Sequence, residues 1–191
     1  MNMCGIAGYI WKKQHDITTL ENCLGLMGRR GPDHSAFYQT NTESGDHLFL
    51  LHTRLAIIDL DPRSNQPWHY DGKTIAFNGE IYNYKEVTAQ LKQQGETFTT
   101  NSDTEVLVKA LSRWGWQGAL EKKLEGMWAF AYYDKKTNQF ILSRDRFGEK
   151  PLYFYQAPDG IYFGSEPKFI FSLLGRRLPI NKEHLKRYLV N

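Results

Sequence analysis

Residues 4–11, Cys4-Gly5-Ile6-Ala7-Gly8-Tyr9-Ile10-Trp11, form a run of small and apolar residues near the beginning of the chain. Such a run predicts a buried β-strand. The cysteine at its start has two interpretations. It is a small core residue, because free cysteine is among the most buried residue types, or it is a nucleophile whose base is the amino group of its own chain. Taken alone, these residues favour the core residue, so the rest of the chain has to decide.

The composition is that of an ordinary globular protein with one domain, or with one domain and the start of another. The chain has 191 residues, of which 41% are hydrophobic and 24% charged, and its net charge is +3. The basic residues are scattered, which argues against nucleic acid as a partner. No segment is apolar and long enough for a membrane span or a signal peptide. With two cysteines, Cys4 and Cys23, we expect a reduced cytoplasmic protein and not a disulfide scaffold.

Hydrophobic spacing predicts three helices in the first two thirds of the chain and one more at its end. They are expected at 17–28, at 83–95 with Asn83 as the cap, from Ser102 to Gly115, and from Asn181 onward. The third begins with a capping box, in which Glu105 follows Ser102 by three residues.

Short apolar runs bounded by turn residues predict the strands. They are expected at 4–11, 36–39, 48–58 with a break near Arg54, 74–77, 127–134, 139–144, 152–156 and 161–164. We expect the last four to form an antiparallel meander. Because the helices are segregated from runs of strands, the pattern predicts a layered α+β fold rather than alternating βαβ units.

Several common kinds of site have no motif in this sequence. The six histidines show no metal-ligand spacing, so no metal site is expected. There is no G-x-S-x-G elbow for a serine triad, and no glycine-rich loop for a nucleotide phosphate.

Four polar stretches stand where a plain core would be apolar. Arg54 interrupts the run 52–59, Asn78-Gly79 follows an apolar strand, Asp103 begins a helix, and residues 143–154 form a charged turn. Each also has a simpler interpretation. Asn-Gly is the strongest short hairpin signal, and an aspartate in the first turn suits the helix dipole.

Together these stretches supply what is needed to cleave the side-chain amide of a free amino acid. An arginine binds an α-carboxylate through two parallel bonds. Glu80 and Asp103 can bind an α-ammonium group. The thiol of Cys4 attacks the carboxamide, and the amide of Asn78 with the N–H of Gly79 stabilises the oxyanion that forms.

Seven motifs resemble, in order, the N-terminal glutaminase domain of glutamine-dependent asparagine synthetases, a class II glutamine amidotransferase of the N-terminal nucleophile type. They are CGIAGYI (4–10), RRGPDHSAFY (29–38), RLAIIDLDPRSNQP (54–67), FNGEIYN (77–83), SDTEVLVKAL (102–111), LEGMWAFAYYD (124–134) and RDRFGEKPLYF (144–154). They cover most of the chain, from Cys4 to about Glu166. The motifs NGEIYN and RDRFGEKPLYF are similar to the asparagine-synthetase branch rather than to the sugar or purine branches.

The resemblance implies the four-layer αββα sandwich of N-terminal nucleophile hydrolases, with mostly antiparallel sheets. It also implies a role for each residue that matches a motif. The catalytic residues are the nucleophile Cys4 and the oxyanion hole of Asn78 and Gly79. The residues implied in glutamine binding are Arg54, Leu55, Ala56, Ile57 and Ile58 at the α-carboxylate, Glu80 and Asp103 at the α-amino group, and Asn78 and Gly79 at the carboxamide.

The same resemblance implies that residues 4–175 form a domain that hydrolyses L-glutamine, and that residues 176–191 begin a linker toward a synthetase domain. That second domain, in cis or in trans, would accept the ammonia and use ATP and Mg²⁺, whereas the glutaminase step needs no cofactor. The acceptor stays open between aspartate, a sugar and other carboxylates. A homodimer also stays open.

Two departures from the family pattern bear on these predictions. Arg29 stands where the family has histidine, and we expect it to lie outside the site. Met1-Asn2-Met3 precede Cys4, whereas in the family the cysteine becomes the first residue. A peptide-bonded nitrogen is not a base, so the chain as written lacks the amine that the mechanism needs.

Three hypotheses follow. The first is a glutaminase that becomes active once Cys4 is the first residue. The second is a catalytically silent amidotransferase-like scaffold or binding domain. The third is a non-enzymatic module whose motifs are only turns and helix caps. The joint presence of Cys4, Arg54, Asn78 and Asp103 favours the first, and the three preceding residues favour the second.

Overall fold

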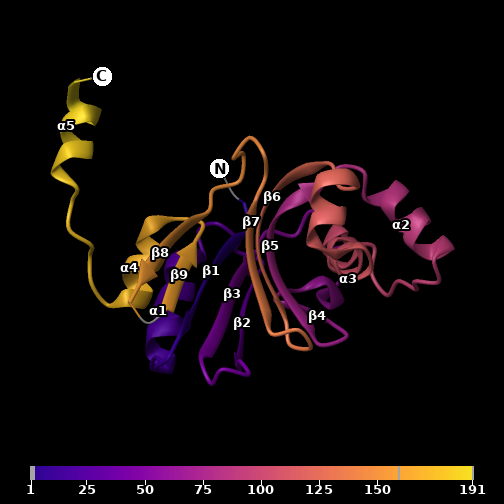
Figure 1. Ribbon diagram of the computed structural model, residues 1–191, viewed down its shortest axis with the longest axis horizontal. Coiled ribbons are helices and arrows are strands. Elements are labelled where there is room, and N and C mark those ends of the chain that lie inside the picture. The colour runs from indigo at the N-terminus through magenta and orange to yellow at the C-terminus, as the bar shows by residue number, and fades with distance from the viewer. Residues whose placement is uncertain (1–2, 159, 191) are drawn as a thin grey trace.

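The computed structural model describes residues 3–158 and 160–190, and its centre is a pair of stacked antiparallel β-sheets (Figure 1). One sheet, here called the first sheet, has the strand order β2 (His34–Asn41), β3 (His47–Arg54), β1 (Gly5–Trp11), β9 (Gly160–Gly164), β8 (Tyr153–Ala157). The second sheet has the order β4 (Trp68–Tyr70), β5 (Lys73–Ile81), β6 (Gly126–Asp134), β7 (Gln139–Arg144). The predicted first strand is therefore the central strand of the first sheet.

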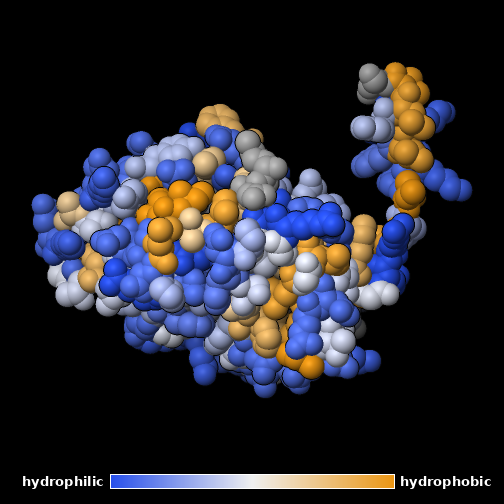
Figure 2. All heavy atoms as spheres, turned by 180° about the vertical axis from the view of Figure 1, so that it is seen from behind, coloured by the Kyte–Doolittle hydropathy of each residue, from blue (hydrophilic) through white to orange (hydrophobic). Residues whose placement is uncertain are grey.

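Helices cover the outer face of each sheet. The helices α1 (Ile17–Met27) and α4 (Pro167–Leu174) pack on the first sheet, and α2 (Tyr84–Gln93) and α3 (Asp103–Lys122) pack on the second (Figure 1). A short 3₁₀ turn spans Pro62–Ser64. The last helix, α5 (Lys182–Val190), stands away from the sheets (Figures 1 and 2). Its side chains are exposed, including the apolar Leu185 and Leu189. No helix in the described part of the chain is both long and apolar enough to cross a membrane.

Three apolar layers hold the four layers of secondary structure together. One lies between the first sheet and its helices, another lies between the second sheet and its helices, and the third lies between the sheets. In β1, Ile6 faces the second sheet, while Ala7 and Tyr9 face α1 and α4. A strand buried on both faces has to be apolar throughout, which explains residues 4–11. The predicted αββα sandwich is confirmed.

The structure corrects how the last four strands are connected. The pairs β6–β7 and β8–β9 form as predicted, but β7 belongs to the second sheet and β8 to the first. The expected continuous meander is therefore wrong, because the chain crosses between the sheets after Arg144. The strand expected over 48–58 ends at Arg54. The strand β4 and the helix α4 were not predicted.

Three local predictions about turns, caps and helix ends also change. Asn78-Gly79 lies inside β5 and not at a hairpin turn. Asn83 precedes α2 without capping it, since its side-chain amide instead bonds Lys123 O and Glu125 N at 2.9 and 3.0 Å. The helix expected to end at Gly115 continues to Lys122 after a kink, where Gly115 has φ +69°.

The capping box at α3 is half confirmed. Ser102 caps the helix by accepting a 3.2 Å bond from the Thr104 N–H. Glu105 does not reach back to Ser102 but bonds the N–H groups of Thr99 and Thr100 and pairs with Lys109 at 2.9 Å. Both charged side chains are buried, so this pair fixes the segment that leads into α3.

Candidate active site

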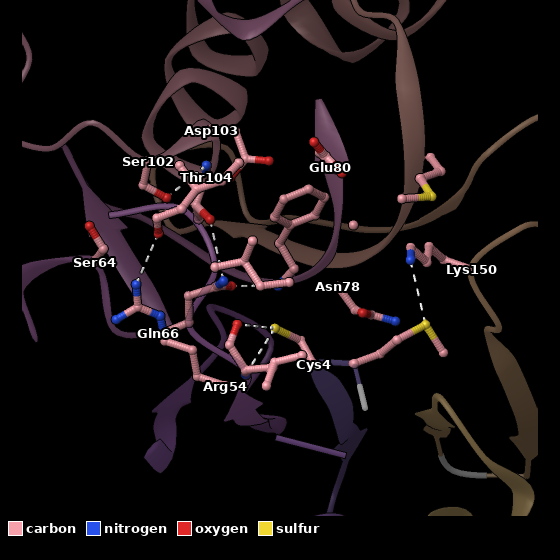
Figure 3. Close-up of a pocket in the computed structure, with 17 residues that line it drawn as sticks. Cys4, Arg54, Ser64, Gln66, Asn78, Glu80, Ser102, Asp103, Thr104 and Lys150 are labelled. Atoms are coloured by element: carbon pink, nitrogen blue, oxygen red, sulfur yellow. Dashed lines mark hydrogen bonds between the residues drawn. The ribbon is translucent and has the colours of Figure 1, made fainter. Parts of the chain in front are cut away.

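A pocket opens where the start of β1, the end of β3 and the outer edge of β5 meet the first turn of α3 (Figure 3). Of the residues predicted for the site, all but Ala56 line this pocket: Cys4, Arg54, Leu55, Ile57, Ile58, Asn78, Gly79, Glu80 and Asp103. The N–H of Ala56 instead donates a 2.8 Å bond to Asp33. Arg29 is exposed and does not line the pocket, as expected.

The thiol of Cys4 lies against the backbone of Leu55. The Leu55 N–H donates to Cys4 Sγ at 3.4 Å, and the thiol contacts the Leu55 carbonyl at 3.6 Å. Burial raises the pKa of the Cys4 thiol, although the Leu55 contact and the nearby cation Arg54 lower it. The thiol is therefore protonated at neutral pH and needs a base to become a nucleophile.

Arg30 holds the backbone on both sides of the peptide bond that precedes Cys4. The Met3 N–H donates a 2.9 Å bond to the Arg30 carbonyl, and Arg30 Nε donates a 3.0 Å bond to the Cys4 carbonyl. Its guanidinium also pairs with Glu166 at 3.1 Å. The nitrogen of Cys4 is thus held at the pocket, where it is bonded to Met3.

Arg54 is buried at the end of β3, and its guanidinium organises the loop that follows. It donates to Asn65 Oδ1 at 2.8 Å, to the carbonyls of Ile58 and Asp61 at 3.2 and 3.3 Å, and to the carbonyl of Asp59. No carboxylate pairs with it among the residues described. Arg54 is therefore a cation at the pocket wall whose contacts are all with neutral groups.

Asn78 and Gly79 lie side by side on β5. Asn78 is 2% exposed, and its Nδ2 has no hydrogen-bond partner within residues 3–158 and 160–190. A buried amide donor without a partner is costly, so it marks a place where an acceptor is expected. Gly79 has to be glycine, because a Cβ there would lie 2.3 Å from the Met127 carbonyl oxygen.

Asp103 and Glu80 place negative charge on the side of the pocket that lies across from Cys4 and Arg54 (Figure 3). Asp103 is buried and accepts a 3.1 Å bond from the Ile81 N–H, while Glu80 is exposed. Burial raises the pKa of the Asp103 carboxyl to about 6, and the charge of Glu80 adds to this effect. At pH 7 the pair presents anionic oxygens that suit an ammonium group.

Eight lining residues were not predicted: Met3, Ser64, Gln66, Phe77, Ser102, Thr104, Met127 and Lys150. Gln66 and Lys150 lie within the motifs SNQP and RDRFGEKPLYF, so the sequence contained a signal for them but no role. Lys150 Nζ lies 3.5 Å from Met3 Sδ. It is placed there by Asp145, whose carboxylate accepts bonds from four backbone N–H groups, including that of Lys150.

No group of three or more His, Cys, Asp or Glu side chains is arranged to hold a metal ion within the part of the chain that the structure describes. The pocket offers a thiol, an unpartnered amide donor, two cationic side chains (Arg54 and Lys150) and two carboxylates. These groups suit a small zwitterion with a carboxamide, since each of its polar ends meets a complementary partner.

Comparisons with known proteins agree with this geometry. A family model of a glutamine amidotransferase domain matches residues 3–191. The chain is 35% identical over 177 residues to glutamine-hydrolyzing asparagine synthetase 3 of Bacillus subtilis (strain 168), which covers 89% of this chain and 28% of that protein. It is 37% identical over 175 residues to a probable glutamine-hydrolyzing asparagine synthetase of Dictyostelium discoideum, covering 88% and 30%.

Solved structures show the same fold. A glutamine phosphoribosylpyrophosphate amidotransferase from B. subtilis superimposes with a TM-score of 0.66 at 23% identity, covering 90% of this chain and 44% of that one. The chain spans between 28% and 39% of the length of three curated relatives that it matches.

Two stacked antiparallel sheets between layers of helices are the fold that this chain shares with that solved amidotransferase. The chain belongs to the glutamine amidotransferase domain family. The family and the fold predicted from the seven motifs are thereby confirmed.

Proposed function

We propose that this chain hydrolyses L-glutamine to L-glutamate and ammonia through a thioester on Cys4. The observation that carries the proposal is the buried Asn78 Nδ2, which has no partner among the described residues and lines the same pocket as the Cys4 thiol. An unpartnered donor beside a nucleophile is the arrangement that stabilises an oxyanion during acyl transfer.

The charges at the pocket wall support an orientation for the substrate. Glutamine's α-carboxylate lies toward Arg54 and the backbone of residues 55–58, where it exchanges with part of the loop contacts that the guanidinium makes. Its α-ammonium group lies toward Asp103 and Glu80. This leaves the carboxamide between Cys4 and the Asn78–Gly79 pair.

The reaction proceeds in two acyl-transfer steps. The Cys4 α-amine takes the thiol proton, and the sulfur attacks the carboxamide carbon, so that the carbonyl oxygen becomes an oxyanion held by Asn78 and Gly79. The tetrahedral species collapses, the C–N bond breaks, and the ammonium proton passes to the leaving group, which departs as ammonia. Water then attacks the thioester and releases glutamate and the thiol.

We propose that the ammonia is used by an asparagine synthetase-like domain that needs ATP and Mg²⁺, in cis or in trans. The names of the similar proteins and the part of their length that this chain covers support this partner. In this proposal residues 4–175 are the catalytic domain, and residues 176–191, with their exposed helix, begin the linker. A cytoplasmic location fits Cys4 and Cys23, which are both free thiols.

A silent scaffold is the second candidate, and one observation favours it. Met3 lines the pocket, and its N–H is bonded to Arg30. Because Met3 precedes Cys4, the nitrogen of Cys4 is a peptide amide in this chain. An amide nitrogen cannot accept the thiol proton.

The test uses a chain that starts at Cys4, with the start verified by mass spectrometry. Release of glutamate and ammonia from glutamine is measured, and a rapid acid quench traps the glutamyl thioester for mass analysis. The Cys4→Ala variant is the control and should show neither product nor adduct. A correctly folded chain that starts at Cys4 and releases no glutamate would leave the scaffold as the better description.

A further inference from the structure

The outer edge of β5 loses its neighbouring strand just before the catalytic pair. The strand β4 pairs with β5 from Tyr70↔Lys73 to Trp68↔Ile75 and then ends. In this register the next position opposite Phe77 belongs to residue 66. Gly72 and Tyr82, which flank β5, bond to Lys135 and Glu125, which flank β6. In the β5–β6 register the even-numbered residues therefore bond toward β6, and the odd-numbered residues of β5 direct their N–H and C=O groups to the β4 side.

The side chain of Gln66 takes the place of the missing strand. Its Oε1 accepts a 2.7 Å bond from the Phe77 N–H. Gln66 is 6% exposed, so this bond is shielded from water. On the same edge His52 Nε2 donates a 3.0 Å bond to the Phe77 carbonyl. Burial lowers the pKa of His52 to about 3, so the ring stays neutral in this contact.

The edge therefore presents three odd-numbered N–H groups, and two of them are occupied. Phe77 donates to Gln66 and Ile81 donates to Asp103. The N–H of Gly79 lies between them and points to the same side, next to the side chain of Asn78. The bonds at Phe77 and Ile81 hold the strand on both sides of Gly79, whose N–H is left to bind a ligand.

The other end of Gln66 reaches the opposite wall of the pocket. Its Nε2 donates a 3.3 Å bond to the Thr104 hydroxyl in the first turn of α3, one residue after Asp103 (Figure 3). Both ends of the amide are thus engaged with the protein. Gln66 lines the pocket with each of its two polar side-chain atoms already bonded to the protein.

We infer that Gln66 is a positioning residue for the reaction proposed above. Its side chain replaces the next residue of β4 as the partner of the Phe77 N–H. This bond holds the Phe77–Gly79 backbone in place, so that the Gly79 N–H and Asn78 Nδ2 can donate to one oxygen. It also ties this donor pair to the helix turn that carries Asp103. The inference rests on the proposed function, since it assigns the pair to the oxyanion.

The variant Gln66→Met keeps the length of the side chain and removes both bonds. In a chain that starts at Cys4, its kcat should fall about ten- to hundredfold, because small displacements of catalytic groups cost this much. The KM for glutamine should change less than about threefold, since ground-state contacts remain. The aldehyde analogue of glutamine, which forms a tetrahedral adduct with the thiol, should inhibit more weakly by the same factor as kcat/KM, while inhibition by L-glutamate stays unchanged.

Two further variants provide the controls. Asn83 is also an amide that bridges two backbone groups, but it does not line the pocket. Asn83→Met should therefore lower the thermal midpoint without changing kcat. Gln66→Glu keeps an acceptor for the Phe77 N–H and can accept from the Thr104 hydroxyl, so its kcat should stay closer to the wild-type value than that of Gln66→Met.

An unchanged kcat in Gln66→Met, or an equal weakening of the aldehyde and of L-glutamate, overturns the inference. If Gln66→Met does not fold, a loss of kcat in Gln66→Glu as large as that in Asn78→Ala overturns it. Amide hydrogen exchange gives a readout that needs no turnover, because only Gln66→Met, and not Asn83→Met, should accelerate exchange at Phe77. A wild-type chain that does not hydrolyse glutamine but shows this exchange pattern would reject the proposed reaction and keep the structural role of Gln66.

Discussion

Arg30 bonds to the backbone of Met3 and of Cys4. The Met3 N–H donates to the Arg30 carbonyl at 2.9 Å, and Arg30 Nε donates to the Cys4 carbonyl at 3.0 Å. Together these bonds hold the backbone on both sides of the Cys4 nitrogen. In a chain that starts at Cys4 the bond from Met3 is lost, the bond from Arg30 Nε to the Cys4 carbonyl remains, and the nitrogen of Cys4 is an amine instead of an amide.

A chain that starts at Cys4 should hydrolyse glutamine at least about a hundredfold faster than one that keeps Met1-Asn2-Met3. A free α-amine titrates near pH ~7.7–8.0 and can accept the thiol proton, whereas an amide nitrogen cannot. The measurement is glutamate release by two preparations whose first residue has been verified by mass. Equal rates would mean that the base is a different group.

Asn78→Ala should lower kcat roughly a hundredfold or more and leave KM nearly unchanged, since the oxyanion contact forms only in the tetrahedral state. Steady-state kinetics with glutamine measures both constants. Asn83→Ala is the matched control, because it removes an amide of the same kind outside the pocket. An intact kcat with a raised KM would show that Asn78 binds the ground state.

Arg54→Ala should raise the KM for glutamine roughly thirtyfold or more, because losing a buried bonded charge costs on the order of 2 kcal/mol or more. The loop contacts of the guanidinium disappear with it, so a lower thermal midpoint is expected as well. Arg63→Ala is the control, since this arginine lies in the same loop with its side chain 49% exposed. A fully unfolded Arg54→Ala chain would contradict a role in binding alone.

Asp103→Asn should stabilise the protein at pH 7.5 and have little effect at pH 4. The folded pKa of about 6 lies above the ordinary aspartate value of 3.8, so the folded state binds more protons between these values and stability falls as pH rises through this window. The full difference corresponds to about 3 kcal/mol above pH 6. Urea unfolding of both chains at the two pH values measures it, and equal stabilisation at both would show that burial of the charge is not the cause.

Much of this architecture can be predicted from local patterns, and the gaps have physical reasons. Cys4 to Trp11 predict a doubly buried strand, because period and composition are local properties. The assignment of β7 and β8 to different sheets is not local, since nothing near Arg144 says that the next strand pairs with β9 rather than with β7.

The candidate site divides in the same way. Residues such as Asn78 and Asp103 are recognisable because their chemistry differs from that of their neighbours in sequence. Gln66 has its role because it lies opposite Phe77 of β5 and bonds its N–H. Lys150 reaches the pocket because Asp145 bonds the backbone of the loop that carries it. Such roles depend on which strands become neighbours, so an isolated motif predicts the residue but not its partner.

The central position of β1 has a consequence for the order of events during synthesis. Its two neighbours are β3, at His47–Arg54, and β9, at Gly160–Gly164. At about 5–20 residues per second, a ribosome needs roughly 8–30 s to reach the second of them. During that interval the segment that carries Cys4 has at most one strand beside it, so it is less enclosed than in the finished sheet. Once β9 has paired with β1 and the Ser165 N–H donates to the Ile6 carbonyl, both sides of β1 are occupied.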